Sequence, residues 1–402
     1  MRACFLLAAI LVTPLAFAQS TEIASKEEGA SGALVHAGLL APVDIAFGLD
    51  GTLYYASFES GELRAIAPGA EGPGEIVWTA PNVQTGGERG FVGLVLAPDF
   101  GTSRAFYVNY QHNGTDGIVT RLSRVVDGEE SVLLVNTQPG LLHNSGRIAF
   151  HPDGTLFMSV GDGIIDTAAR SKSAHAQDPS DIRGKVVRLT ADGAPAPGNP
   201  WGNEAWTKGH RNVYGLAISP EGVVLATENG PDHWDEVNVL EAGKDYGWPT
   251  CMGICPGDES VDPVLTYEST IAPTGAVWYR GHFYFTDFNK GSVHRVYERE
   301  DGTWADERVL KFTTPRILDV AVGPEGLYVS TWDSVWLVEP GVVGSAPVEP
   351  EPVTTPSPSG TPPPTESVGG EAVIGEGGRG VTGAGALLAL AAMTAASRRR
   401  RP

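Results

Sequence analysis

Three polar loops in the middle of the chain carry residue types that could do chemistry together. They are segments 143–147 (His-Asn-Ser-Gly-Arg), 208–215 (Lys-Gly-His-Arg-Asn-Val-Tyr-Gly) and 228–236 (Glu-Asn-Gly-Pro-Asp-His-Trp-Asp-Glu). Together they offer a histidine for proton transfer, a guanidinium that binds anions, and carbonyl and carboxylate oxygens of the kind that Ca²⁺ prefers. The combination predicts a concave site for an anionic or polar ligand, without naming a reaction.

Each loop taken alone also has a simpler interpretation. A histidine at a strand entry is more often a turn residue than a base. An Arg-Asn pair can bind surface carboxylates, and Asp-rich loops are commonly solvated turns. The functional interpretation therefore depends on a fold that brings the three loops to one place.

A repeated unit of two strands joined by a turn predicts that fold. Its turns contain glycines at positions 51, 101, 154, 222, 281 and 326, mostly preceded by Asp or Glu. Asp-Gly between alternating apolar runs is a strong hairpin signal. A third apolar strand follows the turn in each unit, at 61–66, 119–125, 184–189, 236–240, 292–296 and 335–338.

Six units of three or four strands predict an all-β protein, a six-bladed β-propeller over residues 33–341. A two-sheet sandwich agrees less well with the sequence, because its turns recur every 8 to 12 residues without this longer period. In a propeller the first strand of each blade and its loops surround a central channel. We therefore expect the three polar loops at one mouth of that channel.

Both ends of the chain read as targeting segments. Residues 1–18 have one positive charge, an apolar run and Ala-Phe-Ala before Gln19, which predicts a secretory signal peptide. A buried N-terminal helix is the alternative. Residues 342–380 are rich in Pro and Gly and predict a disordered stalk. Residues 381–402 form an apolar run closed by an Arg cluster, which predicts a sorting tail that could anchor the protein in a membrane; a tail without function is the alternative.

The composition agrees with an exported protein. With 28 Lys and Arg against 48 Asp and Glu, the net charge is −20, which argues against a nucleic-acid partner because phosphates would be repelled. Beyond Cys4, which lies in the signal peptide, Cys251 and Cys255 are the remaining cysteines. In a secreted chain such a pair predicts a disulfide, whereas redox or metal chemistry would favour a C-x-x-C spacing or more ligands.

The motifs around the polar loops resemble the soluble glucose/sorbosone dehydrogenase family, the quinoprotein aldose sugar dehydrogenases. The resemblance runs in order over about residues 35 to 340. The matching segments are 88–94 with 97–100, 143–163, 176–179 with 183–189, 209–217, and 229–249. Several of these motifs are long, so the resemblance is specific at the family level.

The resemblance implies a six-bladed propeller that holds pyrroloquinoline quinone and Ca²⁺ at the channel mouth. His143 would be the general base that takes the proton of the sugar's anomeric hydroxyl while a hydride passes to the quinone. Asp162 would orient that histidine. Arg211 and Asn212 would hold the cofactor and polarise its reacting carbonyl. Glu88 would face the substrate beside the cofactor.

The family also implies metal ligands and further cofactor contacts. The backbone carbonyls of Gly230 and Pro231 would bind the Ca²⁺ that touches the quinone. Asp235, Glu236 and Tyr246 match residues around a second, structural Ca²⁺.

The chain departs from the family where the cofactor's other carboxylates bind. Asn289 stands in place of a lysine, with Lys290 one step away, and an Arg-x-Arg-Asp motif reads Arg316-Ile-Leu318-Asp. Lys290 and Arg316 are the cations left to bind these carboxylates, and each lost cation weakens binding.

Three functions follow. The first is an exported quinoprotein dehydrogenase with a small-molecule sugar substrate and an electron acceptor that the sequence does not identify. The second is a non-catalytic propeller displayed on the cell surface, similar to hedgehog-interacting proteins. The third, a metal-dependent sugar lactonase, would need carboxylates around one central metal, and the sequence assigns none.

Overall fold

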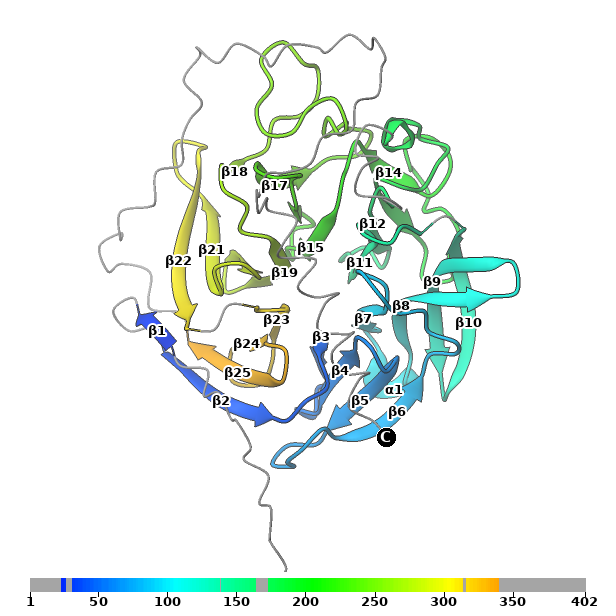
Figure 1. Cartoon of the computed structure of the whole chain (residues 1–402), viewed down its shortest axis with the longest axis vertical. Coiled ribbons are helices and arrows are strands. Elements are labelled where there is room, and N and C mark those ends of the chain that lie inside the picture. The colour runs from blue at the N-terminus through cyan, green and yellow to red at the C-terminus, as the bar shows by residue number, and fades with distance from the viewer. Residues whose placement is uncertain (1–22, 27–30, 138, 164–172, 314–315, 340–402) are drawn as a thin grey trace, which may run out of the picture.

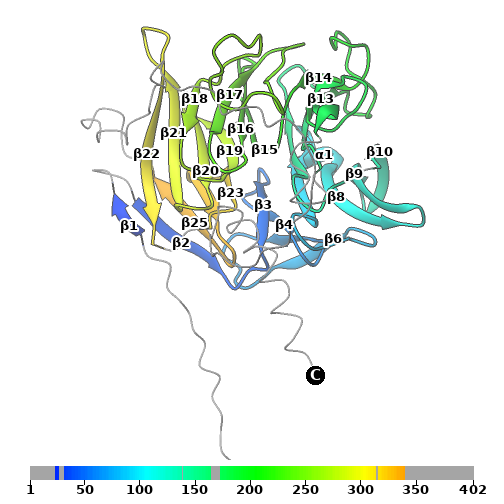
Figure 2. The same cartoon turned by 45° about the horizontal axis from the view of Figure 1, so that its top comes forward.

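Six antiparallel sheets stand in a ring around a central axis (Figures 1 and 2). The computed structural model describes residues 23–26, 31–137, 139–163, 173–313 and 316–339. The all-β, six-bladed propeller predicted from the repeat is therefore confirmed. The expected signal peptide, stalk and sorting tail lie outside the described residues.

In each blade one strand lies at the axis, and the other strands follow it outward in the order given. Blade 1 is β3 (Pro42–Phe47), β4 (Leu53–Ser57), β5 (Glu62–Ile66) and β6 (Glu75–Thr79); blade 2 is β7 (Phe91–Leu96), β8 (Phe106–Gly114), β9 (Gly117–Val126) and β10 (Glu129–Asn136). Blade 3 is β11 (Ser145–Phe150), β12 (Leu156–Val160), β13 (Lys185–Leu189) and β14 (Ala205–Lys208); blade 4 is β15 (Val213–Ile218), β16 (Val224–Glu228), β17 (Asp235–Leu240) and β18 (Leu265–Tyr267). Blade 5 is β19 (Pro273–Tyr279), β20 (His282–Asp287), β21 (Ser292–Glu298), β22 (Trp304–Phe312) and β1 (Ile23–Lys26); blade 6 is β23 (Asp319–Val322), β24 (Leu327–Ser330), β25 (Ser334–Glu339) and β2 (Ser31–Ala37).

The predicted hairpin turns join the first two strands of the blades. In blade 3 the Asp153 carboxylate accepts the Thr155 N–H at 2.9 Å, and in blade 1 Asp50 accepts the Thr52 N–H at 3.0 Å. Such Asx turns fix a tight reversal and explain why Asp-Gly is a strong signal. Blade 2 differs, because a short helix α1 (Phe100–Ser103) replaces the tight turn.

Apolar side chains from neighbouring blades pack against one another. Between blades 1 and 2, for example, Trp78, Phe91 and Tyr110 form a buried aromatic group with ring centroids 6.0 to 6.5 Å apart. Burying a side chain of this size contributes about 1.5–3 kcal/mol. The apolar core therefore consists of layers between neighbouring blades, and other residues fill the central axis.

The two ends of the propeller sequence meet in blade 6. Strand β2 pairs antiparallel with β25, from Ser31 opposite Glu339 to Ala37 opposite Ser334. The ring is therefore closed by backbone hydrogen bonds between the first and the last part of the propeller, which covers an edge that would otherwise be open.

A buried arginine crosses the axis and divides the channel. The Arg147 guanidinium lies 2.9 Å from Asp44 and 3.3 Å from Asp319, and it also donates to the carbonyls of Val43, Tyr214 and Leu318. On one side of Arg147 is the mouth where the inner strands begin, which we call the loop mouth. On the other side, where the inner strands end, lies a cavity of about 710 Å³.

Two further features bear on the predictions. The Cys251–Cys255 disulfide is present, as expected from the cysteine count. In the part of the chain that the structure describes, no helix is long and apolar enough to cross a membrane.

Candidate active site

Five of the predicted site residues come from loops of blades 2, 3 and 4 and meet at the loop mouth: Glu88, His143, Asp162, Arg211 and Asn212. Hydrogen bonds between these loops tie them together: the Ser145 hydroxyl donates to Asn212 at 2.8 Å, and the Asp162 N–H donates to the Arg211 carbonyl at 2.8 Å. These residues lie at or near the first residues of β11 and β15 and the end of β12. The closed ring thus brings together residues that are between 19 and 124 positions apart.

His143 and Asp162 form a buried pair. His143 Nδ1 lies 2.7 Å from Asp162 Oδ1, and the two side chains are 3% and 0% exposed. His143 has a left-handed backbone, with φ of 55°. A Cβ at Gly161 would lie 2.1 Å from the His143 carbonyl oxygen, so glycine is required there for the close approach.

The second oxygen of Asp162 is also bound. Oδ2 accepts the Ser173 hydroxyl at 2.6 Å and the Trp248 indole N–H at 2.8 Å. Burial alone would raise the pKa of Asp162, but the hydrogen bonds from His143 and Ser173 outweigh it and lower the pKa. Asp162 is therefore a fixed anion that orients His143 through Nδ1, so that Nε2 is the nitrogen that can take a proton.

Arg211 lies beside this pair. Its Nη1 donates to the carbonyls of Asn229 and Gly230 at 2.7 and 2.8 Å, and its guanidinium lies 5.5 Å from the centre of the Trp248 ring. Burial lowers the pKa of Arg211 from its ordinary value. Its Nε is buried without a hydrogen-bond partner among the described residues.

Glu88 connects the histidine to the asparagine. It is completely buried, and its Oε2 accepts the His143 N–H at 2.8 Å and the Asn212 amide at 3.3 Å. Its Oε1 has no partner in the described part of the chain. Buried polar atoms usually have a partner, so a polar ligand that reached Glu88 Oε1 or Arg211 Nε would satisfy that atom.

The carbonyl predicted as a Ca²⁺ ligand lies next to Arg211. The Gly230 carbonyl accepts Arg211 Nη1, its N–H donates to Asp235 at 2.7 Å, and Pro231 is half-buried at the mouth. The other Asp235 oxygen accepts the Thr270 hydroxyl and two backbone N–H groups at 2.7 to 2.9 Å. Asp235 therefore fixes the loop that carries the Gly230 carbonyl.

Glu236 and Tyr246, predicted near a second Ca²⁺, have protein partners. Glu236 accepts the Gly253 N–H and the Asn238 amide, and the Tyr246 hydroxyl donates to the Val239 carbonyl. Burial and the neighbouring Glu228 carboxylate raise the pKa of Glu236 to about 8. Within the described ranges no group of three His, Cys, Asp or Glu side chains could hold a metal, so ligands to Ca²⁺ would have to include backbone carbonyls.

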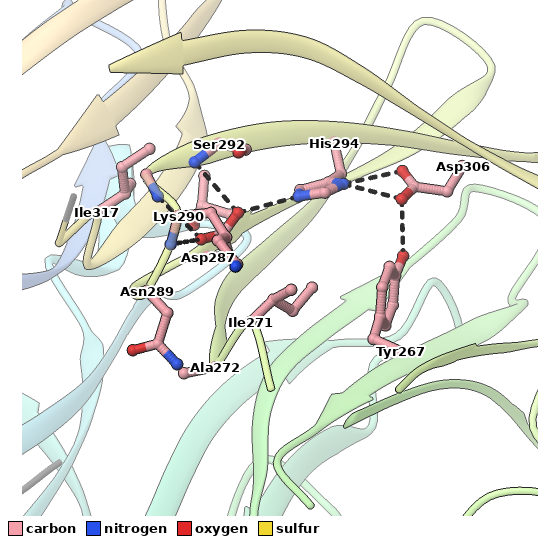
Figure 3. Close-up of polar contacts among 12 residues, drawn as sticks. Tyr267, Ile271, Ala272, Asp287, Asn289, Lys290, Ser292, His294, Asp306 and Ile317 are labelled. Carbon is pink, nitrogen blue, oxygen red and sulfur yellow. Dashed lines mark hydrogen bonds and ion pairs between the residues drawn. The ribbon is translucent and has the colours of Figure 1, made fainter. Parts of the chain in front are cut away.

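Asp287 holds the loop where the family carries a cofactor lysine (Figure 3). Its carboxylate accepts the N–H groups of Lys290, Gly291 and Ser292 and contacts His294 at 3.0 Å. On its other side, His294 Nδ1 contacts the Asp306 carboxylate at 2.9 Å. These interactions fix the backbone of the loop.

His294 carries a positive charge in this network. Burial would lower its pKa, but Asp306 and Asp287 outweigh burial and raise the pKa of His294 to about 10. Asp306 also accepts the Tyr267 hydroxyl at 2.9 Å. Blade 5 therefore encloses a histidine cation between two carboxylates.

The side chains in this region do not supply all of the cations that the family resemblance predicts for the cofactor's carboxylates. The Asn289 amide donates to the Thr270 carbonyl at 3.1 Å, Lys290 is exposed and Arg316 is half-buried. Leu318 is buried beside Phe288 in the core. The floor of the mouth is accordingly an apolar cavity of about 30 Å³, lined by residues that include Phe58, Phe288, Leu318 and Trp332.

The sequence did not indicate the side chains that support the pair. Trp248 stands in a motif quoted for the family, but nothing in the motif shows that its indole reaches Asp162. Ser173 has no sequence signal. Arg147 belongs to the first polar loop, yet its guanidinium binds Asp44 and Asp319 at the axis.

The comparisons with known proteins agree with this fold. The model of the Glucose / Sorbosone dehydrogenase family matches residues 39–335. The aldose sugar dehydrogenase YliI of Escherichia coli is 28% identical over 334 residues, which cover 73% of this chain and 87% of that protein. Quinoprotein glucose dehydrogenase B of Acinetobacter calcoaceticus is 28% identical over 278 residues, covering 60% of this chain and 56% of the relative.

A solved structure shares the fold. The PQQ-bound aldose sugar dehydrogenase of Streptomyces coelicolor superposes with a TM-score of 0.68 at 27% identity, covering 78% of this chain and all of that one. The family match extends over more than half of the chain and includes every blade. The chain therefore belongs to the glucose/sorbosone dehydrogenase family.

Proposed function

We propose that this protein is an exported quinoprotein dehydrogenase that oxidises an aldose at its anomeric carbon. One observation carries the proposal: the buried His143–Asp162 pair shares a mouth with Arg211 and Glu88, each of which has an unpartnered buried polar atom. A base, a cation and a hydrogen-bond acceptor around one opening are what oxidation of a sugar hydroxyl requires.

Each residue then has a definite task. Pyrroloquinoline quinone, when bound, would supply the group that takes up the hydride of the anomeric carbon. His143 Nε2 takes the proton of the anomeric hydroxyl, so that the sugar loses one hydride and one proton and leaves as a lactone. Asp162 stabilises the imidazolium that results. Arg211 and Asn212 orient the cofactor carbonyl, and Glu88 Oε1 accepts a hydrogen bond from the sugar.

The residues present fit the reacting part of the quinone. The unpartnered Arg211 Nε supplies a donor there. Lys290 and Arg316 are the cations that would hold its carboxylates. The carbonyls of Gly230 and Pro231 would hold Ca²⁺, and the Gly230 oxygen has a second lone pair for the metal beside the one that accepts Arg211 Nη1.

Export and anchoring belong to the same proposal. A signal peptide at 1–18 would direct the chain out of the cytoplasm, and the Cys251–Cys255 disulfide is consistent with an oxidising compartment. The tail at 381–402 would anchor it to a membrane or cell surface. The electron acceptor that the proposed oxidation requires would then lie outside the cytoplasm.

The test is reconstitution of the purified protein with pyrroloquinoline quinone and Ca²⁺. Turnover of a panel of aldoses is followed with an artificial electron acceptor. We expect turnover in the wild type, and a loss of more than a hundredfold in kcat for His143→Ala, because a general base contributes about 10²–10⁴-fold. His151→Ala, at the opposite end of β11, is the matched control and should retain activity. The absence of quinone-dependent turnover in the wild type would refute the proposal.

A non-catalytic propeller is the second candidate, and Asn289 and Leu318 favour it because they replace two cations of the family motif. It predicts that the folded protein does not retain the quinone. The lactonase hypothesis predicts hydrolysis of a sugar lactone without quinone, so the same assay distinguishes all three functions.

A further inference from the structure

Lys185 has a completely buried ammonium group that the proposed reaction does not use. Its Nζ donates to the backbone carbonyls of His175, Ala176 and Arg183 at 3.0, 2.9 and 2.8 Å. An ammonium has three N–H bonds, so all of them are used. Burying a charge is costly unless it is bonded in this way, so the arrangement needs a reason.

Two of these carbonyls belong to a turn that holds Asp162. The turn is the 3₁₀ helix η2 (Ala174–Gln177), and Ser173 immediately precedes it. The Ser173 hydroxyl donates to Asp162 Oδ2 at 2.6 Å, and His175 Nε2 lies 2.6 Å from the Asp162 carbonyl. The turn thus contacts both the side chain and the backbone of the residue that orients His143.

We propose that Lys185 is a positioning residue for the His143–Asp162 pair. Its ammonium fixes the carbonyls of η2, and η2 with Ser173 fixes the carboxylate that orients the imidazole. Lys185 acts through the backbone of the turn and makes no direct contact with either member of the pair.

The protonation state of Lys185 gives this role a pH dependence. Burial lowers the pKa of Lys185 to about 8. Below that pH the ammonium holds three carbonyls; above it the neutral amine has two N–H donors and turns a lone pair toward the third carbonyl. The charged groups around Lys185 are Asp178 and Asp181, which raise its pKa, and Arg183 and Lys208, which lower it.

The test follows His143 directly in the protein without quinone. Carbon-13 labelling of histidine gives imidazole Cε1–H signals, and His143→Ala assigns the one of interest. We expect the wild-type His143 signal to shift in a step near pH 8. In Lys185→Met the signal at pH 6.5 should already match that of the wild type at pH 9.5. Lys244→Met removes an exposed lysine and should behave as the wild type.

A conservative variant keeps the test decisive if Lys185→Met does not fold. Lys185→Arg stays charged at every pH used, so its His143 signal should show no step near pH 8. A folded Lys185→Met with a wild-type His143 signal, or a wild type without the step near pH 8, would overturn the proposal.

A kinetic test rests on the proposed function. In the reconstituted enzyme at pH 7, Lys185→Met should lower kcat about tenfold or more, because small misplacements of a catalytic group are costly, while quinone affinity stays within twofold. If no variant, including the wild type, turns over sugar, the proposed function fails, and the His143 signals still decide the role of Lys185.

Discussion

At the scale of single residues, the backbone of His143 shows how the mouth is built. A left-handed conformation costs about 1–3 kcal/mol in a residue with a side chain. Here the His143 N–H donates to Glu88, and its carbonyl accepts the Gly163 N–H at 3.1 Å. Both backbone groups are therefore held by other residues of the mouth, which keeps the imidazole aimed at Asp162.

Replacing Asn289 with lysine tests whether the missing cations weaken cofactor binding. Asn289→Lys should raise the affinity for pyrroloquinoline quinone about tenfold, because one charge-assisted hydrogen bond to a carboxylate contributes about 1.5–3 kcal/mol. The measurement is a fluorescence or calorimetric titration at two salt concentrations. Asn113→Lys adds the same charge at an exposed position in blade 2 and serves as the control. Equal affinities of the two variants would contradict the assignment of this loop to the cofactor.

Glu236 should make stability depend on pH. Because its pKa is raised to about 8, the folded protein keeps a proton that the unfolded chain releases above about pH 4.3. Stability therefore falls as pH rises from about 4.3 through about 8. Glu236→Gln still accepts the Gly253 N–H and cannot ionise, so its free energy of unfolding should fall less between pH 5 and 9.

Denaturant unfolding at pH 5, 7 and 9 checks this expectation. Glu259→Gln, at an exposed position, is the control and should follow the wild type. If the free energy of unfolding depends on pH in the same way in Glu236→Gln and the wild type, Glu236 does not cause the fall in stability.

Only some residues of the site could be predicted from the sequence. His143, Arg211 and Asn212 stand in contiguous motifs, so their types and order were sufficient to select them. Trp248 and Ser173 bind Asp162 through contacts that exist only after the blades pack, and single side chains without a motif give no sign of such contacts. Lys290 stays a predicted cofactor cation; its side chain is exposed, and Asp287 binds its backbone N–H.

At the scale of elements, the inner three strands of each blade were predictable and the outer strands were not. The first strands combine apolar alternation with a turn residue, as in the Asp153-Gly turn before β12. Outer strands such as β6 and β10 are largely exposed, so they lack that alternation. The pairing of β25 with β2 could not be predicted from the neighbouring sequence either, because β2 lies about 300 residues away in the chain.

Strand β2 should be needed for ring closure. Deleting residues 1–37 removes it and exposes the backbone edge of β25. The melting temperature should drop by about 5 °C or more, with aggregation through the open edge. Deleting residues 1–30 removes β1 and keeps β2, so this control should melt closer to the full chain. Differential scanning calorimetry with light scattering measures both effects, and equal melting of the two deletions would contradict the closing role of β2.

At the scale of the whole molecule, one position in each inner strand determines what fills the axis. Asp44, Arg147 and Asp319 occupy it in blades 1, 3 and 6, and glycine occupies it in the others. A Cβ at Gly275 would lie 1.9 Å from Asp319 Oδ1, so glycine makes room for the charged group. The loop mouth and the 710 Å³ cavity are therefore separated by ion pairs rather than by an apolar core.

Arg147 connects four blades, because its partners lie in blades 1, 4 and 6 and it belongs to blade 3. Arg147→Met should destabilise the protein by about 3–5 kcal/mol, since Asp44 and Asp319 would be left buried without their cation. Burial raises the pKa of both carboxyl groups, so both are protonated more easily in the folded protein. The loss should therefore be larger at pH 9 than at pH 5, where the carboxyl groups can be neutral.

Removing the two carboxylates distinguishes an electrostatic role of Arg147 from a role in which its side chain only fills space at the axis. In Arg147→Met combined with Asp44→Asn and Asp319→Asn, the amide oxygens can still accept the Leu94 and Ile45 N–H groups that the carboxylates bind at 2.9 and 2.8 Å. This triple variant should recover part of the lost stability and lose the extra pH dependence. If it is no more stable than Arg147→Met at pH 9, the cost comes from the cavity and the lost backbone hydrogen bonds, and repulsion between the two carboxylates has no part in it.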